Sequence, residues 1–269
     1  PDRCAFGPSR HHVLGARFVD GTGRSLRSGG RLVKNVTGFD LHRLHVGARG
    51  TLGVLLEVSL RLVPAPEAEV YVATPRESTL AEAVERALAI RADRSVTPRM
   101  LFVADRAVHV VLGGRAAQVD AERAALDGLC DAADERTGGD VELAALRAAA
   151  RTPALRILTA PSRVAEVARA IESTLGATDG VVVEPDAAIV DVPASLVDER
   201  TGAWTDALLP ALDALGAKVE RRGRRDAALE GAIAARLAPR SAELVWTRRL
   251  VDAFDPARLF RIDGFPAGV

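Results

Sequence analysis

Two neighbouring stretches decide the fold: Val33-Lys34-Asn35-Val36-Thr37-Gly38-Phe39-Asp40-Leu41, and Gly47-Ala48-Arg49-Gly50-Thr51-Leu52-Gly53-Val54-Leu55-Leu56-Glu57-Val58. Thr37 and Asp40 predict the start of a short helix, because their side-chain oxygens can accept from its unpaired first N–H groups. Gly47 then occupies the place of a C-terminal glycine, which takes a left-handed conformation at little cost. Between them, helical spacing places Leu41, Leu44 and His45 on one face.

A strand follows this short helix and its loop. From Val54 the apolar residues recur at every second position, which predicts a half-buried strand. Pro64 and Pro66 end it, because proline cannot donate to a strand ladder. One predicted face carries Val54, Leu56, Val58, Leu60 and Leu62, and the other carries Glu57, Ser59 and Arg61.

Gly47, Gly50 and Gly53 recur at every third residue, which suits a backbone that approaches a ligand closely. Their spacing is neither the dinucleotide fingerprint G-x-G-x-x-G nor a P-loop, because no Gly-Lys-Ser/Thr follows. Glycines at such junctions also serve turns alone. The case for a ligand loop therefore rests on the whole string between Gly7 and Pro66.

That string resembles the second half of the FAD-binding domain in FAD-linked oxidases of the vanillyl-alcohol oxidase/PCMH type. The resemblance is strongest to the FAD-binding subunits of bacterial glycolate oxidases. The preceding strand–hairpin–strand of the family is matched by Phe6-Gly7, Arg10, Val13-Leu14-Gly15, Gly21-x-Gly23 and Gly29-Gly30. The resemblance implies an FAD site with Gly50, Gly53 and Val54 against the adenosine and pyrophosphate, and with Lys34, Thr37 and Gly38 near the cofactor.

Lys34 is the only lysine of this region, which otherwise uses arginine. Its flexible ammonium suits a phosphate, or the flavin as negative charge develops there. A solvated surface lysine is the alternative. In the family, a further glycine-rich loop that grips the pyrophosphate would lie upstream of Pro1, which leaves open whether this chain alone binds FAD well, poorly or not at all.

The composition excludes several classes of protein. The 36 Lys and Arg balance the 36 Asp and Glu, whereas a nucleic-acid-binding domain is distinctly basic. Cys4 and Cys130 are too few for an iron–sulfur, zinc or disulfide framework, and they predict a reducing, cytoplasmic compartment. No apolar run is long enough to span a bilayer. We therefore expect no direct membrane insertion, and any contact with the inner membrane only through a partner.

Beyond Pro66 the pattern changes, and we expect a partial FAD-binding domain over 1–66 and a second domain over 67–269 with a helical tail. In this second part, Thr79 and Glu82 form a capping box for a helix between strands. Ser162 is expected to cap a second helix, which Gly176 ends. The order strand, helix, hairpin thus occurs twice, over 68–113 and 154–192, and alanine-rich helices are expected over 116–134, 140–151 and 199–215.

This duplication predicts an α+β fold in which helices cover one face of a sheet, related to the ferredoxin-like plan. The family resemblance implies that it is the cap domain, which closes over the isoalloxazine ring and shapes the substrate pocket. The segment Phe254–Phe260 resembles the closing Asp-Pro-x-x-x-Phe of the family. The Asn-Pro-Gly that normally follows is replaced here by Arg261-Ile262-Asp263-Gly264, which puts a C-terminal contact with the flavin domain in question.

No catalytic residue and no metal site can be assigned from the sequence. Oxidation of a 2-hydroxy acid needs a group that holds the carboxylate, a base for the hydroxyl proton and flavin N5 as hydride acceptor. His109 is the only histidine of residues 67–269 and has no visible partner. His42 and His45 could meet one ligand, although a half-buried surface pair is the alternative. The run Arg221–Arg225 could grip a carboxylate or an acidic partner, or form a solvated loop.

Three functions therefore remain open. The first is the FAD-binding subunit of a glycolate-oxidase-type complex, in which a larger FAD catalytic subunit oxidises glycolate or a related 2-hydroxy acid and an iron–sulfur subunit passes the electrons on. The second is a stand-alone FAD-dependent 2-hydroxy-acid dehydrogenase, disfavoured by the shortage of histidine. The third is a flavin-free scaffold of the same complex, which the absent upstream loop favours.

Overall fold

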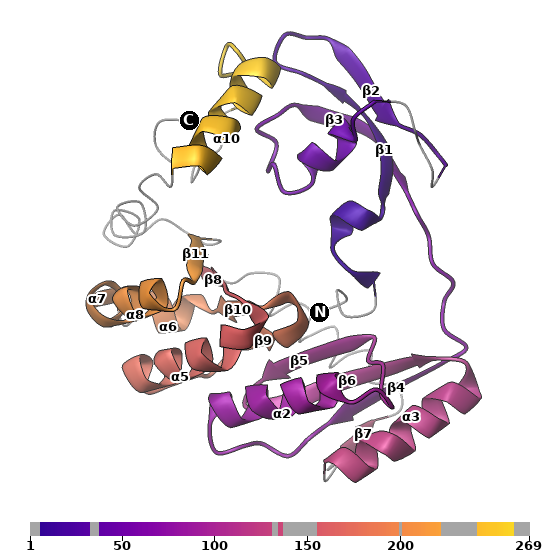
Figure 1. Cartoon of the computed structure of the whole chain (residues 1–269), viewed down its shortest axis with the longest axis vertical. Helices are drawn as coiled ribbons and strands as arrows, with labels where there is room; N and C mark the ends of the chain where they lie inside the picture. Colours follow the sequence, from indigo (N-terminus) through magenta and orange to yellow (C-terminus); the bar gives the residue numbers. More distant parts are fainter. Residues whose placement is uncertain are drawn as a thin grey trace. The chain divides into compact units, whose positions relative to one another are not determined.

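The computed structural model describes residues 6–32, 38–130, 134–136, 155–198, 201–221 and 241–260 (Figure 1). The chain divides into two compact units. The small unit comprises Gly7–Pro64 and Ala234–Val269, and the large unit comprises Pro1–Phe6 and Ala65–Ile233. The division between the units after Pro64 lies close to the domain boundary expected near Pro66. The C-terminal segment, which was expected to belong to the domain over 67–269, groups instead with the N-terminal sheet.

The small unit is built on a three-stranded antiparallel sheet with the strand order β2-β1-β3. Phe18 on the central strand is fully buried, and its ring centroid lies 4.0 Å from that of His45 and 6.1 Å from that of Phe254. These three rings form the core that holds the C-terminal helix to the sheet. The elements are η1 (Ser9–His11), β1 (Val13–Val19), β2 (Ser25–Gly29), η2 (Leu41–His45), β3 (Val54–Leu60) and α10 (Ser241–Phe254).

The strand after the glycine loop forms where it was expected, but it is not half-buried. Val54, Leu56, Val58 and Leu60 are each between 43% and 56% exposed. The reason is that, among the described elements, β1 is the main neighbour of β3 and no helix packs closely on either face of the strand. Alternation alone cannot predict what covers a strand face, because burial depends on the neighbouring elements.

The short helix also differs from its expected form. It is a 3₁₀ helix, in which residues three apart lie above one another. His42 is therefore the buried residue, and Leu41 and Leu44 are exposed. Asp40 at its start makes no capping hydrogen bond, although its carboxylate lies 3.3 Å from the Nε of Arg43.

The large unit is built on an eight-stranded sheet with the order β11-β8-β10-β9-β5-β6-β4-β7, and every pairing is antiparallel. Each half has the chain order βαββαβ and the strand order 4-1-3-2 of a ferredoxin-like unit, and β5 and β9 join the halves. The first half contains β4 (Ala68–Ala73), α2 (Leu80–Ala92), β5 (Met100–Ala104), β6 (Ala107–Gly114), α3 (Ala116–Leu129) and β7 (Asp134–Arg136).

The second half repeats the first with a longer helical segment before its last strand. Its elements are β8 (Leu155–Leu158), η3 (Pro161–Arg163), α5 (Val164–Leu175), β9 (Val182–Glu184), η4 (Pro185–Ala187), β10 (Ile189–Val192), α6 (Ala194–Asp198), α7 (Thr201–Ala203), the π-helical turn η5 (Trp204–Leu208), α8 (Leu209–Ala214) and β11 (Lys218–Arg221). The expected duplication and ferredoxin-like plan are therefore confirmed.

The main core lies between one face of this sheet and the helices, with α2 and α5 side by side (Figure 1). Thr79 and Glu82 form the expected capping box of α2, and Gly176 ends α5 in a left-handed conformation with φ +63°. Ser162 is not the cap of α5, because η3 precedes the helix and its first turn has no side-chain cap. The expected helix over 140–151 lies outside the described residues.

Candidate functional site

The glycine loop between η2 and β3 contains several left-handed residues. Gly47, Arg49, Gly50 and Gly53 have φ values of +89°, +52°, +81° and +142°. The N–H of Thr51 donates to the carbonyl of Ala48 at 3.0 Å, so Arg49 and Gly50 occupy the centre of a turn with the positive φ values of type I′. The loop thus turns its backbone repeatedly within a few residues, of which Gly47, Arg49 and Gly50 are exposed.

The individual glycines are needed for different reasons. A Cβ at Gly53 would lie 2.5 Å from the carbonyl oxygen of Val19, so this glycine lets the loop pass close to the end of β1. Beside Gly38 and Gly47 a Cβ would meet no atom within 4 Å. At these two positions only the positive φ requires glycine, and the space beside the backbone is open to another molecule.

Of the six residues expected at the cofactor, four lie within the described part of the chain. Gly38 and Gly50 are exposed, and Val54 at the start of β3 is half exposed. Gly53 is buried against its own chain. Lys34 and Thr37 lie outside the described residues.

Ser28 and Phe18 of the sheet contact η2, the short helix that precedes the glycine loop. The Ser28 hydroxyl on β2 accepts from the backbone N–H of His42 at 3.2 Å and lies 3.1 Å from its Nδ1. His45 packs on Phe18, and burial lowers the pKa of its imidazole. Its Nε2 is buried without a hydrogen-bond partner. His42 and His45 thus face the sheet and do not meet one ligand.

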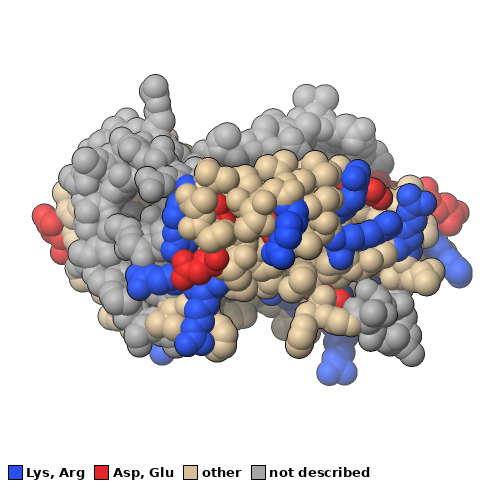
Figure 2. Space-filling view, turned by 90° about the horizontal axis from the view of Figure 1, so that it is seen from above, with Lys and Arg blue, Asp and Glu red and all other residues tan. Residues whose placement is uncertain are grey.

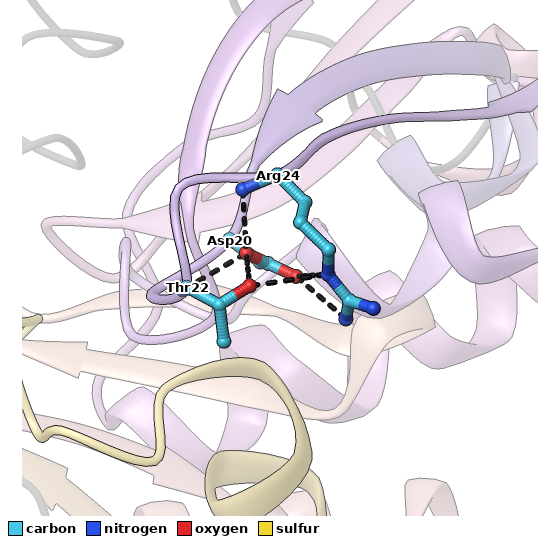
Figure 3. A network of polar contacts seen from close by, with 3 residues as sticks. All are labelled: Asp20, Thr22 and Arg24. Carbon is cyan, nitrogen blue, oxygen red and sulfur yellow. Dashed lines mark hydrogen bonds and ion pairs between the residues drawn. The ribbon is translucent and has the colours of Figure 1, made fainter.

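The β1–β2 hairpin, which supports Gly53 through Val19, is fixed by one carboxylate (Figure 3). Asp20 Oδ1 accepts from the Thr22 hydroxyl at 2.6 Å and from the Thr22 and Arg24 N–H groups at 2.9 and 3.0 Å. Asp20 Oδ2 accepts from the Arg24 guanidinium at 3.0 Å. These hydrogen bonds lower the pKa of Asp20 to about 2, and the one from the Thr22 hydroxyl has the largest effect.

The C-terminal Asp-Pro segment docks on the same hairpin. The N–H of Gly21 donates to the carbonyl of Phe254 at 2.6 Å. Asp255 is buried, and its carboxylate accepts from the N–H groups of Leu259 and Phe260, both at 2.8 Å. The C-terminal contact that the altered Arg261–Gly264 sequence had put in question is thus present up to Phe260.

The sheet face of the large unit opposite the helices carries an aromatic stack. His109 on β6 lies parallel to Phe102 on β5 and to Tyr71 on β4, with ring centroids 4.9 and 5.9 Å apart. The Tyr71 hydroxyl lies 2.6 Å from His109 Nδ1, and His109 Nε2 lies 3.3 Å from the carbonyl oxygen of Ala104. When Nε2–H donates to this carbonyl, Nδ1 accepts from the phenol. The partner of His109 was not visible in the sequence.

Charged residues occupy the other half of this sheet face. The guanidinium of Arg156 on β8 binds Asp191 on β10 through two hydrogen bonds of 2.7 Å. Asp191 is almost fully buried. The hydrogen bonds between Asp191 and Arg156 raise the pKa of Arg156, and the negative charges of Glu184 and Glu220 make a smaller contribution. Because Asp191 neutralises it, Arg156 is a poor cation for a substrate carboxylate.

The described residues offer neither a metal cluster nor a membrane span. No group of three or more His, Cys, Asp or Glu side chains comes together among them. Within the same residues, no helix combines the length and the apolar character needed to cross a bilayer. Figure 2 shows Lys and Arg side chains interspersed with Asp and Glu over the visible described surface. Arg222–Arg225 lie outside the described residues.

Comparison with solved structures shows which proteins share this fold. An alkyldihydroxyacetonephosphate synthase superposes over 96% of this chain and 55% of its own, with a TM-score of 0.58 and 13% identity. A VAO-type flavoprotein from Myceliophthora thermophila superposes over 98% of this chain and 58% of its own, with a TM-score of 0.63 and 13% identity. The chain has the fold of about half of a VAO-type flavoprotein.

Sequence similarity covers a shorter segment. Glycolate oxidase subunit GlcE of Escherichia coli is 46% identical over 84 residues, which are 31% of this chain and 23% of that protein. Glycolate oxidase subunit GlcD of Bacillus subtilis is 47% identical over 62 residues, or 23% of this chain and 13% of that protein. D-2-hydroxyglutarate dehydrogenase of Xanthomonas citri is 41% identical over 61 residues. The chain spans less than a quarter of these curated relatives, and no protein-family model matches it.

Proposed function

We propose that this chain is part of an FAD-linked oxidoreductase acting on glycolate or a related 2-hydroxy acid, and that it contributes the loop 47–54 to the FAD site. The observation that carries the proposal is this loop. Its left-handed backbone is exposed at Gly50 and open beside Gly47, on a fold shared with VAO-type flavoproteins. The similarity to glycolate oxidase subunits supports the substrate class.

The residues present fit a flavin dinucleotide at some positions and not at others. Gly38, Gly47 and Gly50 combine positive φ with access to solvent or open space, as close approach to a pyrophosphate requires. Gly53 is fully explained by its contact with Val19, so we assign it to positioning the loop. Residues 7–64 also carry nine Lys and Arg against three Asp and Glu, which favours an anionic ligand.

Bound FAD would supply the hydride acceptor, which no amino-acid side chain provides. The chain's own part is to hold and orient it. Peptide N–H groups of the loop would donate to the dinucleotide, and Val54 would pack against it. The Lys34 ammonium would pair with a phosphate or with the flavin as negative charge builds up.

We further propose that the chain works within a glycolate-oxidase-type complex, beside a larger FAD catalytic subunit and an iron–sulfur subunit. The only histidine of the described part of the large unit is hydrogen-bonded to Tyr71, and Arg156 is neutralised by Asp191. Neither residue offers a ready base or carboxylate-binding cation. This disfavours a stand-alone dehydrogenase and favours substrate oxidation in the partner subunit.

A flavin-free scaffold of the same complex is the second candidate. The observation in its favour is the position of Gly53. This glycine is the most buried of the three in the loop, and it packs against its own chain. A scaffold keeps such packing without a cofactor.

FAD binding by the purified chain separates the two candidates. We expect flavin absorption bands that persist through gel filtration after incubation with FAD. Gly50→Ala should weaken FAD binding about tenfold, because a side chain there disfavours the left-handed turn and obstructs the ligand. Gly23→Ala is the matched control, since Gly23 has nearly the same φ, +83°, and lies in the hairpin turn. A chain that stays colourless with excess FAD would favour the scaffold.

A further inference from the structure

The short helix η2 is capped by a residue from another strand. The first N–H groups of a helix need acceptors that the helix itself cannot supply. Arg43 donates to the carbonyl of Asp40 at 2.9 Å, but the Asp40 side chain makes no capping hydrogen bond. The N–H of His42 donates instead to the hydroxyl of Ser28 at 3.2 Å. Ser28 on β2 therefore does what a local cap residue does in other helices.

The Ser28 hydroxyl contacts both sides of the turn that starts η2. Besides the N–H of His42, it lies 3.1 Å from His42 Nδ1 and 3.4 Å from the carbonyl oxygen of Phe39. A hydroxyl has one hydrogen to donate and two lone pairs that accept. It can therefore accept from the His42 N–H and donate to the imidazole or to the Phe39 carbonyl at the same time. One side chain thus fixes the backbone from Phe39 to His42.

Both members of this pair are shielded from water. Ser28 is 9% exposed and His42 is 2% exposed. The imidazole lies close to the backbone of Gly29, where a Cβ would come within 2.9 Å of Nδ1, so this glycine makes room for the ring. A hydrogen bond in such surroundings is costly to lose, because the freed polar groups cannot all reach water. The pair is therefore a firm attachment of η2 to the sheet.

The residues held in this way lie between two glycines of the candidate FAD site. Gly38 directly precedes them and Gly47 follows η2, and both combine positive φ with open space beside the backbone. The far end of η2 is held separately, because the ring centroid of His45 lies 4.0 Å from that of Phe18. Ser28 thus fixes the end of the segment next to Gly38, and Phe18 fixes the end next to Gly47.

We propose that Ser28 and His42 are positioning residues of the FAD site, which hold segment 38–47 in its ligand-binding conformation before FAD arrives. The inference rests on the proposed function, because it gives a role to residues beneath the same site. Both side chains are buried in the chain itself, so their effect on affinity comes from preorganisation. A segment that is ordered in only a fraction of the molecules binds with an affinity reduced by that fraction.

The kinetics of FAD binding test this role. Ser28→Ala removes the acceptor of the His42 N–H and should weaken FAD binding about tenfold. The loss should appear as slower apparent association, because fewer free chains have the segment in place. The dissociation rate and the visible absorption and circular dichroism of the bound flavin should stay unchanged, because no contact with the ligand is removed. Ser28→Cys keeps the side-chain volume but accepts hydrogen bonds only weakly, and it should show the same pattern if the alanine variant folds poorly.

Amide hydrogen exchange gives a readout that needs no FAD. The His42 N–H should exchange about tenfold faster in Ser28→Ala than in the unmodified chain, because it loses its acceptor. The matched control is Thr74→Val in the large unit. The buried hydroxyl of Thr74 likewise accepts from a backbone N–H, that of Val108, at 3.0 Å. Thr74→Val should leave both FAD binding and the exchange of His42 unchanged.

The outcomes separate this inference from the proposed function. An unmodified chain that binds no FAD would overturn both. If the unmodified chain binds FAD and Ser28→Ala binds it equally well, or if Thr74→Val weakens binding as much as Ser28→Ala, the positioning role fails and the proposed function stands. Unchanged exchange of His42 in Ser28→Ala has the same meaning. Faster release of FAD from Ser28→Ala with unchanged association would indicate direct contact with the ligand and would also overturn the positioning role.

Discussion

The hydroxyl of Tyr71 and the Nδ1 of His109 are 2.6 Å apart, and both side chains are buried on the sheet face opposite α2 and α5. The two residues come from neighbouring strands, β4 and β6, and their rings are parallel. The hydrogen bond therefore ties the phenol and the imidazole into one unit with Phe102. Loss of either partner leaves a polar group buried without this hydrogen bond.

We expect Tyr71→Phe to lower the free energy of unfolding by about 1–3 kcal/mol, because His109 loses its hydrogen-bond donor in a buried environment. Replacement of both partners, Tyr71→Phe with His109→Phe, should cost less than the sum of the two single changes. Urea unfolding of the four proteins of this cycle measures the coupling. Strictly additive losses would show that the hydrogen bond contributes nothing.

The Arg156–Asp191 pair should be far more important for stability than surface ion pairs. Asp191→Asn leaves a guanidinium in a mostly buried site without its counter-charge, which we expect to cost about 3–5 kcal/mol. Asp127 pairs with Arg123 one turn away on α3 and is half exposed, so Asp127→Asn should cost less than about 1 kcal/mol. Thermal unfolding of the two variants compares them directly. Equal losses would contradict the buried character of the first pair.

The local signals in the sequence predicted the fold of the large unit well. A capping box, a helix-ending glycine and short apolar runs act within a few residues, so they locate α2, α5 and their strands. Their repetition then implied the duplicated sheet. The boundary near Pro64 followed from a change in pattern, whereas the return of α10 to the N-terminal sheet did not, because it depends on the distant contact between Phe18 and Phe254.

The candidate sites were harder to predict, because their geometry depends on distant residues. The partner of His109 is Tyr71, 38 residues away in the chain, and no periodicity reveals it. Gly53 fits a ligand-loop motif, yet the atom that it approaches is the carbonyl oxygen of Val19. The exposure of the β3 side chains depends on which elements cover the faces of the strand, and these lie elsewhere in the sequence. Of these site features, only the positive φ of Gly47 was predicted from the sequence, because this glycine directly follows the short helix.

The contact between Gly21 and the C-terminal segment gives a steric prediction. A Cβ at Gly21 would lie 2.4 Å from Asp255 Oδ1 and 2.7 Å from its Cα. Gly21→Ala should therefore displace Asp255 and lower the free energy of unfolding by about 1–3 kcal/mol. The matched control is Gly30→Ala, because a Cβ at Gly30 meets no atom within 4 Å. Hydrogen exchange should show faster exchange of the Leu259 and Phe260 amides in Gly21→Ala only. Unchanged protection would place the C-terminal segment elsewhere.

Burial of His45 predicts a pH dependence of stability in the small unit. The imidazole packs on Phe18 and Phe254, and desolvation lowers its pKa in the folded chain below the usual value of 6.5. The folded state therefore binds fewer protons than the unfolded state once the pH falls below about 6.5, so stability is retained above that pH and declines below it. His45→Phe removes the titrating group and should reduce this decline, measured as the difference in unfolding free energy between about pH 7.5 and about pH 5.5. The exposed His11 provides the control, and His11→Phe should keep the decline of the unmodified chain. If His45→Phe declines as steeply as the unmodified chain, the charged imidazole is accommodated in the fold and its burial does not govern the acid sensitivity.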